Sequence, residues 1–435
     1  MADKLKRYHQ DRESGGRHAP RLMRVGIAAP LTVIGVIGAG WLIYRFVVDL
    51  LVADTSDAIK TTLAILTLAG AVLAGVYAYR RQRIAESDAH RADANQLADR
   101  YTTAAEQLGH DKAAVRLAGV YTLARLADDW EEQRQVCIDV LCAYLRMPYE
   151  TDPEVTGYKE GEREVRLTII RLVRDHLRHA PESPHSWRGY DFDFTGATFD
   201  GGDFSGAVFT GGRVSFDDVV FSGGTVGFDD ATFSGGEVSF TRATFSGGEV
   251  SFDGAAFSGG EVSFDGAMFS GSRVSFIRAR YSGGRVSFAR ATFFLGTVTF
   301  RRAVFSGGTV SYTGAEFSGR GSLVRFNRAV FSGGEVSFTR ATFSASGSLV
   351  SFDDAVFSGS TVGFDDATFS GSTVRFTRAA FSGGEVSFHG AAFSGGSVDF
   401  QSVASWNSRP YFDDLVLTVP PVGLLLPPPG IVRPS

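Results

Sequence analysis

Phenylalanine recurs on a strict period between residues 190 and 400. The chain contains 37 Phe, and 35 of them fall between Phe192 and Phe400. A representative copy reads ATFSGGEVSFTR, residues 231–242, and the next copy starts at Ala243, so the phrase repeats every twelve residues. A repeated unit of this length buries its apolar face only by stacking on its neighbours. The period therefore predicts a solenoid with a core made largely of Phe.

The first copies show a smaller unit of five residues. Phe194, Phe199, Phe204 and Phe209 fall five apart, and the Phe spacing then alternates between seven and five. Each later copy is two five-residue units, such as VSFTR and ATFSG, plus two residues. This pattern resembles the pentapeptide-repeat family, whose motif is a small residue, any residue, a central Leu or Phe, and two mostly polar residues. The resemblance covers about half of the chain and implies an all-β, right-handed quadrilateral β-solenoid. Val replaces Ala in every second unit, and Phe replaces Leu almost everywhere.

Strand geometry supports a solenoid without the resemblance. Alternate side chains of an extended segment share a face, so the first and third residues of V-S-F and A-T-F point into the core. The S-G-G that follows supplies the chain reversal, because Gly adopts positive φ at little cost.

The length of one coil is open between twelve residues with two faces and twenty-four residues with four. We favour twenty-four, because two thin faces leave little width for paired Phe rings. The inserts at residues 318–324 and 344–350 also favour twenty-four residues, since they then lie at one corner of adjacent coils. This choice predicts about nine coils, with Phe233 beneath Phe257 and Leu323 packed on Leu349.

The residues before the repeats predict a membrane anchor. Residues 1–24 form a basic cytoplasmic tail, and two uncharged runs follow at residues 25–44 and 61–79 within the segment 25–83. Each run is about long enough to cross a bilayer, which needs about 20 apolar residues. Arg and Lys flank the pair on both outer sides, so the positive-inside rule places both termini in the cytoplasm. We expect two transmembrane helices in the cell membrane.

Residues 84–189 predict a juxtamembrane helix and a small α-helical capping domain. Helices are expected at residues 112–127, 131–145 and 162–179, where apolar residues recur at helical spacing. The stretch EQLGHDKAAVRLAGVYTLARLADD resembles the segment before the repeats of membrane-anchored pentapeptide-repeat proteins of actinobacteria. Its expected task is to cover the open first coil.

Candidate chemical sites are few. His176, His179 and His185 cluster in the sequence as a possible metal site, but a His at a helix end is also common because it complements the helix dipole. Asp pairs recur as either a solvated surface or a calcium site, at Asp217-Asp218, Asp229-Asp230, Asp353-Asp354 and Asp365-Asp366. We predict no catalytic, cofactor-binding or metal-binding residue, and the sequence leaves open whether the Asp pairs bind cations.

The predicted function is therefore that of a non-enzymatic, membrane-tethered interaction scaffold. Its expected partners are the lipid bilayer and an unidentified cytoplasmic protein, with no small-molecule substrate and no nucleic acid. The alternative is a DNA-mimicking regulator of gyrase, since some pentapeptide-repeat proteins act in this way. Residues 190–400 carry 21 acidic and 15 basic residues, and Arg301-Arg302, Arg325 and Arg328 interrupt the acidic surface. Residues 401–435 are expected to form a C-terminal cap, with Trp406 and Phe412 over the last coil, and a Pro-rich tail. The tail is either disordered, extended along the solenoid, or a peptide ligand.

Overall fold

The chain divides into two structural units, residues Met1–Asn95 and Gln96–Ser435. The computed structural model describes residues 37–38, 41–42, 44–46, 55–344 and 346–428. Helix α3 (Thr55–Leu108) starts in the first unit and ends in the second, just before Gly109.

The predicted membrane spans have different outcomes. Most of the first span, residues 25–44, lies outside the described residues, and the second, residues 61–79, lies within α3. Among the residues that the structure describes, no helix has the length and apolar character needed to cross a membrane. The predicted helical hairpin is therefore not found, and the membrane tether stays a prediction.

A compact helical block opens the second unit after α3. It contains α4 (Ala113–Asp129), the short 3-10 helix η1 (Glu131–Gln133), α5 (Arg134–Arg146) and α6 (Glu162–Arg178), close to the predicted bounds. The helices form because their apolar residues recur on one face, and that face is buried in a shared core. The core includes Val120, Leu123, Ile138, Leu141, Val165 and Ile169.

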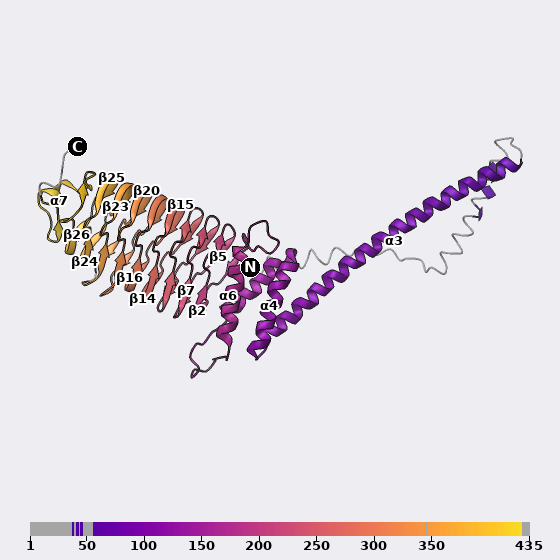
Figure 1. The fold of residues 1–435 in the computed structure, drawn as a ribbon, viewed down its shortest axis with the longest axis horizontal. Helices are drawn as coiled ribbons and strands as arrows, with labels where there is room; N and C mark the ends of the chain where they lie inside the picture. Colours follow the sequence, from indigo (N-terminus) through magenta and orange to yellow (C-terminus); the bar gives the residue numbers. More distant parts are fainter. Residues whose placement is uncertain (1–36, 39–40, 43, 47–54, 345, 429–435) are drawn as a thin grey trace, which may run out of the picture. The chain divides into compact units, whose positions relative to one another are not determined.

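Beyond residue 190 the chain forms a parallel β-solenoid of about ten turns, since ten strands follow one another along one path of its first sheet (Figure 1). Sheet 1 has 13 strands: β1 (Phe192–Asp193), β4 (Val208–Phe209), β5 (Arg213–Ser215), β8 (Thr232–Phe233), β9 (Glu237–Ser239), β12 (Ala256–Phe257), β13 (Glu261–Ser263), β15 (Arg280–Ser287), β17 (Val304–Ser311), β20 (Val330–Ser337), β23 (Val356–Gly363), β25 (Ala380–Ser387) and β27 (Ser405–Trp406).

Sheet 2 has 15 strands: β2 (Thr198–Phe199), β3 (Gly202–Asp203), β6 (Val220–Phe221), β7 (Thr225–Gly227), β10 (Thr244–Phe245), β11 (Glu249–Ser251), β14 (Met268–Ser275), β16 (Thr292–Thr299), β18 (Glu316–Phe317), β19 (Leu323–Arg325), β21 (Thr342–Phe343), β22 (Leu349–Ser351), β24 (Thr368–Arg375), β26 (Ala392–Asp399) and β28 (Leu424–Leu425). Each coil contributes to both sheets and turns a corner between them.

Strand register confirms the twenty-four-residue coil. Phe233 of β8 pairs with Phe257 of β12, and their ring centroids lie 4.9 Å apart. Leu323 pairs with Leu349 across β19 and β22, so the two inserts lie at the same place of sheet 2 on adjacent coils. The structure has about ten turns, slightly more than the nine coils expected. The four-sided cross-section stays a prediction.

The core consists of columns of stacked aromatic rings, with Ala and Val between them. Phe264 is fully buried and stacks between Phe240 and Phe288, each with a centroid separation of 4.7 Å. Neighbouring columns meet edge to face, as Phe216 and Phe228 do at 5.6 Å and 86°. Both arrangements are favourable for aromatic rings, so each coil adds ring contacts to the hydrophobic gain of burial.

The helical block covers the first coil, as expected. Helix α5 packs against β1, and α6 packs against β3 and β4. Gly202 of β3 has φ of +142°, and a Cβ there would lie 2.9 Å from Cδ1 of Ile170 in α6. The close approach of α6 therefore depends on the absence of a side chain at residue 202.

The C-terminal residues close the other end of the solenoid. Trp406 meets the rings of Phe381 and Phe400 edge to face at 5.3 Å, and Phe412 stacks on Phe388 at 4.9 Å. Helix α7 (Asp414–Thr418) follows, and β28 then pairs with β26 with Leu424 buried. Within the described part of the Pro-rich tail, Leu424 and Leu425 thus pair with the last coil, whereas Val419 and Val422 are exposed.

Candidate functional site

Outward side chains at equivalent positions line up in straight rows along the solenoid. In one row of sheet 1, Arg213 pairs in register with Glu237, Glu237 with Glu261, and Glu261 with Arg285. In the matching row of sheet 2, Glu249 pairs in register with Arg273. The sign of the charge therefore changes along a single row, and the sequence of each repeat sets the residue that its coil adds to the row.

The first Asp of each pair holds adjacent coils together. The Asp217 carboxylate accepts a hydrogen bond from the Ser239 hydroxyl and another, of 3.0 Å, from the backbone N–H of Thr241. Asp229 and Asp365 make the same bonds to the next coil. These carboxylates are structural, so the solvated-surface interpretation is wrong for them.

The second Asp of each pair lies at a tight corner. Asp218 and Asp354 have φ of 57° and 58°, in the left-handed region. Asp218 accepts two hydrogen bonds of 2.7 Å from Arg242, and Asp354 accepts bonds of 2.6 and 2.8 Å from Arg378. The hydrogen bond from Arg242 lowers the pKa of Asp218, and that from Arg378 lowers the pKa of Asp354. Bidentate pairs of this kind leave both carboxylates occupied by the protein itself.

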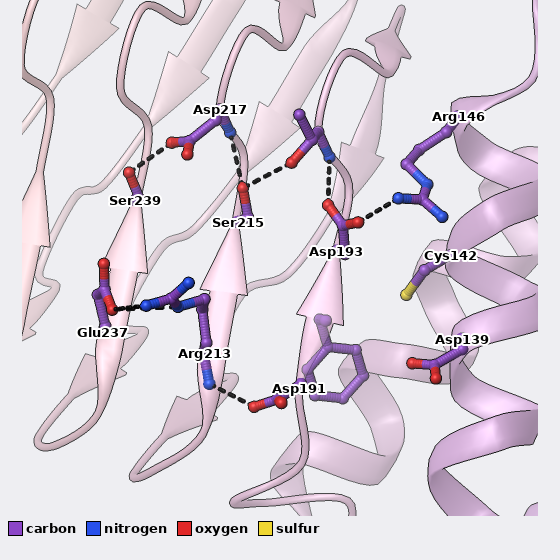
Figure 2. Close-up of a pocket in the computed structure, with 12 residues that line it drawn as sticks. Asp139, Cys142, Arg146, Asp191, Asp193, Arg213, Ser215, Asp217, Glu237 and Ser239 are labelled. Atoms are coloured by element: carbon purple, nitrogen blue, oxygen red, sulfur yellow. Dashed lines mark hydrogen bonds and ion pairs between the residues drawn. The ribbon is translucent and has the colours of Figure 1, made fainter. Parts of the chain in front are cut away.

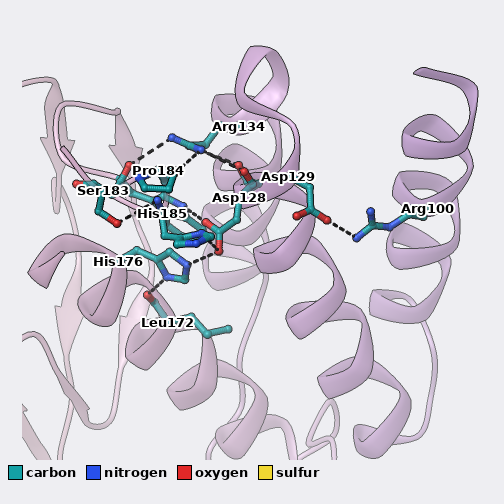
Figure 3. Close-up of polar contacts among 12 residues, drawn as sticks. Arg100, Asp128, Asp129, Arg134, Leu172, His176, Ser183, Pro184 and His185 are labelled. Atoms are coloured by element: carbon teal, nitrogen blue, oxygen red, sulfur yellow. Dashed lines mark hydrogen bonds and ion pairs between the residues drawn. The ribbon is translucent and has the colours of Figure 1, made fainter. Parts of the chain in front are cut away.

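The predicted histidine cluster forms around one carboxylate (Figure 3). Nε2 of His176 and Nδ1 of His185 each lie 3.2 Å from Oδ2 of Asp128, and the Trp187 indole donates to Oδ1 at 3.2 Å. His176 also stacks on Trp187 with centroids 3.9 Å apart. His179 lies further out, with its ring 5.8 Å from that of His176. The contacts tie the end of α4 to the end of α6.

Among the described residues, no group of three or more His, Cys, Asp or Glu side chains could hold a metal ion. The three histidines are thus not gathered as metal ligands, and burial and hydrogen bonding explain the position of His176.

A hollow of about 560 Å³ lies between α5 and the first coils (Figure 2). Arg146 of α5 forms an ion pair with Asp193 across it, and Arg213 donates its backbone N–H to Asp191 at 2.7 Å. Burial raises the pKa of the Cys142 thiol to about 12, so the thiol stays protonated at neutral pH and is a poor nucleophile. Most of the polar groups of the hollow bind each other, which identifies it as the seam between the block and the solenoid.

A second hollow, of about 540 Å³, lies within the helical block. It is lined by Leu108 and Met147 and by a buried polar cluster. In that cluster, Glu162 accepts a hydrogen bond of 2.8 Å from the Tyr144 hydroxyl and lies 3.3 Å from Nε of Arg116. The buried charges neutralise each other within the helical core.

The structure also brings together residues that the sequence analysis did not single out. Large apolar side chains lie on the outer face of sheet 2, with Met268, Phe294 and Leu295 between 43% and 48% exposed. Leu323 and Leu349 are half-buried on the next two coils. We call these five residues the apolar patch. The available signal was the sequence FFLGT at residues 293–297, where other copies have FSGG.

Six exposed arginines lie at or next to the corner that follows sheet 2 in the same coils, where Arg325 ends β19 and Arg280 starts β15. We call them the arginine corner: Arg278, Arg280, Arg301, Arg302, Arg325 and Arg328. Backbone hydrogen bonds stack this corner coil on coil, from Arg278 N–H to the Arg301 carbonyl and from Arg302 N–H to the Asn327 carbonyl, both 3.0 Å. In the sequence, four of these arginines are apparent only as interruptions of an acidic surface.

Comparisons with protein-family models, with curated proteins and with solved structures find no match. The fold itself defines a class, a parallel β-solenoid capped by a small helical block. Its twenty-four-residue coils and the five-residue Phe spacing fit a pentapeptide-repeat protein.

Proposed function

We propose that the chain is a non-enzymatic interaction scaffold that presents the solenoid to a protein partner in the cytoplasm. The observation that carries this proposal is the register of the outer rows, such as Glu237, Glu261 and Arg285 on successive coils. A row fixed to the backbone at the strand spacing of about 4.8 Å is a preorganised set of contacts, which lowers the entropic cost of binding.

Proximity labelling in the native host tests the scaffold. The labelling enzyme is fused to the full chain and, as the matched control, to a chain that ends at residue 189. We expect proteins that are labelled only when the solenoid is present. Equal sets of labelled proteins from the two chains would mean that the solenoid has no partner of its own.

We also propose that residues 25–44 and 61–79 tether the scaffold to the cell membrane. A second structural proposal is that each coil of the solenoid has four sides. The support for the tether is the sequence alone: two uncharged runs flanked by Arg and Lys. Membrane fractionation and external protease treatment of intact cells test it. Cleavage within residues 190–400 would place the solenoid outside the cell. The actinobacterial affiliation likewise rests on the resemblance alone.

The second candidate function is regulation of gyrase by mimicry of DNA. It is favoured by the acidic residues of the first coils, where Glu237, Glu249 and Glu261 occupy one repeat position in successive copies. Arg242 neutralises Asp218 in the same coils, and Arg273 and Arg285 reverse the sign of the rows. A supercoiling assay with residues 85–435 discriminates the two functions, because inhibition at micromolar protein would favour mimicry.

A further inference from the structure

The apolar patch is concentrated where the repeat is least regular. Phe294 and Leu295 replace the Ser and Gly that follow Phe in most copies, and the next two coils carry the inserts before Leu323 and Leu349. Leu295 pairs in register with Ser270, and Leu323 pairs with Thr297. In each of these two rows, a polar residue on one coil is followed by a Leu on the next coil. A cluster of exposed large apolar side chains on an otherwise polar solenoid marks an interaction site.

The arginine corner lies within reach of the same partner. Strand β16 carries Leu295 and ends at Thr299, two residues before Arg301. Six residues of extended chain span about 20 Å, so one bound segment can contact both features. Of the six arginines, only Arg328 has a described carboxylate within ion-pair distance, Asp354 at 3.8 Å. The other five present their charge to solvent.

The backbone shows that arginine at this corner has a cost. Arg278, Arg302 and Arg328 have φ of 59°, 60° and 59°, in the left-handed region that disfavours side chains other than Gly, Asn and Asp. The equivalent position of another coil is Gly254, which adopts the same conformation freely. Arginines with positive φ also occur at the other corner, at Arg242, Arg290 and Arg340, but they alternate there with Gly266 and Gly314. Among the described residues, only this corner carries such arginines on three successive coils.

We propose that the apolar patch and the arginine corner together form a docking surface for an acidic, amphipathic segment of a partner protein. The inference rests on the proposed scaffold function and adds the place and the chemistry of the contact. The segment places apolar side chains on Phe294 and Leu295 and carboxylates on Arg301, Arg302 and their neighbours.

Composition favours a protein over a nucleic acid as the occupant. Aromatic residues, Met and Arg are the residues enriched in protein interfaces, and all three types occur here. A phosphate backbone would use the arginines but would leave the five apolar side chains without a partner. A helical segment needs about 14 residues to span about 20 Å, at 1.5 Å per residue.

The test selects binders from a displayed library of random peptides of about 16 residues, using the full chain in mild detergent. We expect the enriched peptides to be net acidic with spaced apolar residues. Their affinity, measured by fluorescence anisotropy, should fall at least about tenfold, or 1.4 kcal/mol, in either of two double variants. One is Arg301→Asp with Arg302→Asp, and the other is Phe294→Ser with Leu295→Gly.

Both variants copy sequences that the chain already uses in equivalent positions, Asp353-Asp354 and the Ser-Gly of the regular copies, so they should fold. The control is Arg290→Asp at the corner that follows sheet 1, where φ is 56° and Asp218 and Asp366 occupy equivalent positions. It should change the affinity by less than about twofold.

Four results would overturn the proposal. The selected peptides could lack net acidic charge, or bind all variants equally. A duplex of about 24 base pairs could bind the parent and lose affinity in the arginine variant, which would identify a nucleic-acid site. Self-association of the parent that is lost in both variants would identify a second copy as the occupant. None of these results bears on the proximity-labelling test, so a scaffold that binds elsewhere remains distinguishable.

Discussion

Tyr281 stacks on Phe257 as if it were another phenylalanine, with ring centroids 4.8 Å apart and an angle of 5° between the rings. Its hydroxyl is buried and has no hydrogen-bond partner in the described part of the chain, and the same holds for Tyr312. Burial raises the pKa of both phenols far above its usual range, so both hydroxyls remain neutral. Two polar groups therefore lose their hydration within an aromatic core.

Tyr281→Phe and Tyr312→Phe should each stabilise the solenoid, because each removes an unsatisfied buried hydroxyl and keeps the ring stack. The expected gain is about 1 kcal/mol in the free energy of unfolding. Denaturant unfolding measures this gain. Phe305→Tyr, in the same ring column as Tyr281, is the reverse control, because it adds a buried hydroxyl. Destabilisation by both Tyr→Phe changes would show that the hydroxyls do have a partner.

Phe264→Asp should destabilise the solenoid by several kcal/mol, since it places a charge in the fully buried ring column between Phe240 and Phe288. Arg273→Asp, at an outward position of β14, which follows Phe264 in the chain, should change the stability by less than about 1 kcal/mol. Thermal unfolding compares the two. Equal shifts in melting temperature would contradict the assignment of inward and outward positions.

Gly202→Ala should weaken the contact between α6 and the first coil, because the new methyl group would lie 2.9 Å from Cδ1 of Ile170. Gly196→Ala is the matched control, since φ is +73° there and a Cβ would meet nothing within 4 Å. The free energy of unfolding of the control should fall only by the conformational cost of a side chain at positive φ, about 1 kcal/mol.

In the double variant Gly202→Ala with Ile170→Ala, part of the loss should be recovered relative to the sum of the single changes. Strict additivity of the two changes in unfolding free energy would mean that the collision is not the cause.

The stability of the helical block should fall at acid pH through Asp128. Burial acts to raise the pKa of Asp128, but the hydrogen bonds from His176 and Trp187 and the charges of His176 and His185 outweigh it and hold the pKa below 3.8. Because the folded value lies below the unfolded one, the contribution is complete above about pH 4 and is lost as the pH falls through the folded value. Asp128→Asn should flatten the acid limb of stability against pH in denaturant titrations. An unchanged acid limb would exclude this carboxylate as its source.

Much of the fold follows from the Phe period, because a ring at every fifth or seventh residue is buried only if the coils stack in register. The coil length required a second signal, the inserts that bring Leu323 against Leu349. The contact of Ile170 with Gly202 could not be predicted, since it depends on how α6 meets the first coil.

The candidate surfaces were harder to predict than the core. The bond from Ser239 to Asp217 joins residues of successive coils, whereas the repeat pattern assigns both only to an outward face. The apolar patch was visible as the replacement of Ser and Gly by Phe294 and Leu295, but its exposure depends on where β16 places those residues on the outer face of sheet 2.

One coil contains two copies of the twelve-residue phrase, and this makes changes in the length of the chain unequal. Removal of a single copy would transfer every later strand from one sheet to the other and carry the arginine corner to the opposite side of the molecule. Removal of two consecutive copies would shorten the solenoid by one coil and leave every later row where it was. Insertions and deletions that preserve the surface are therefore expected in steps of twenty-four residues, and an odd copy would rebuild the whole exterior beyond it while leaving the aromatic core intact.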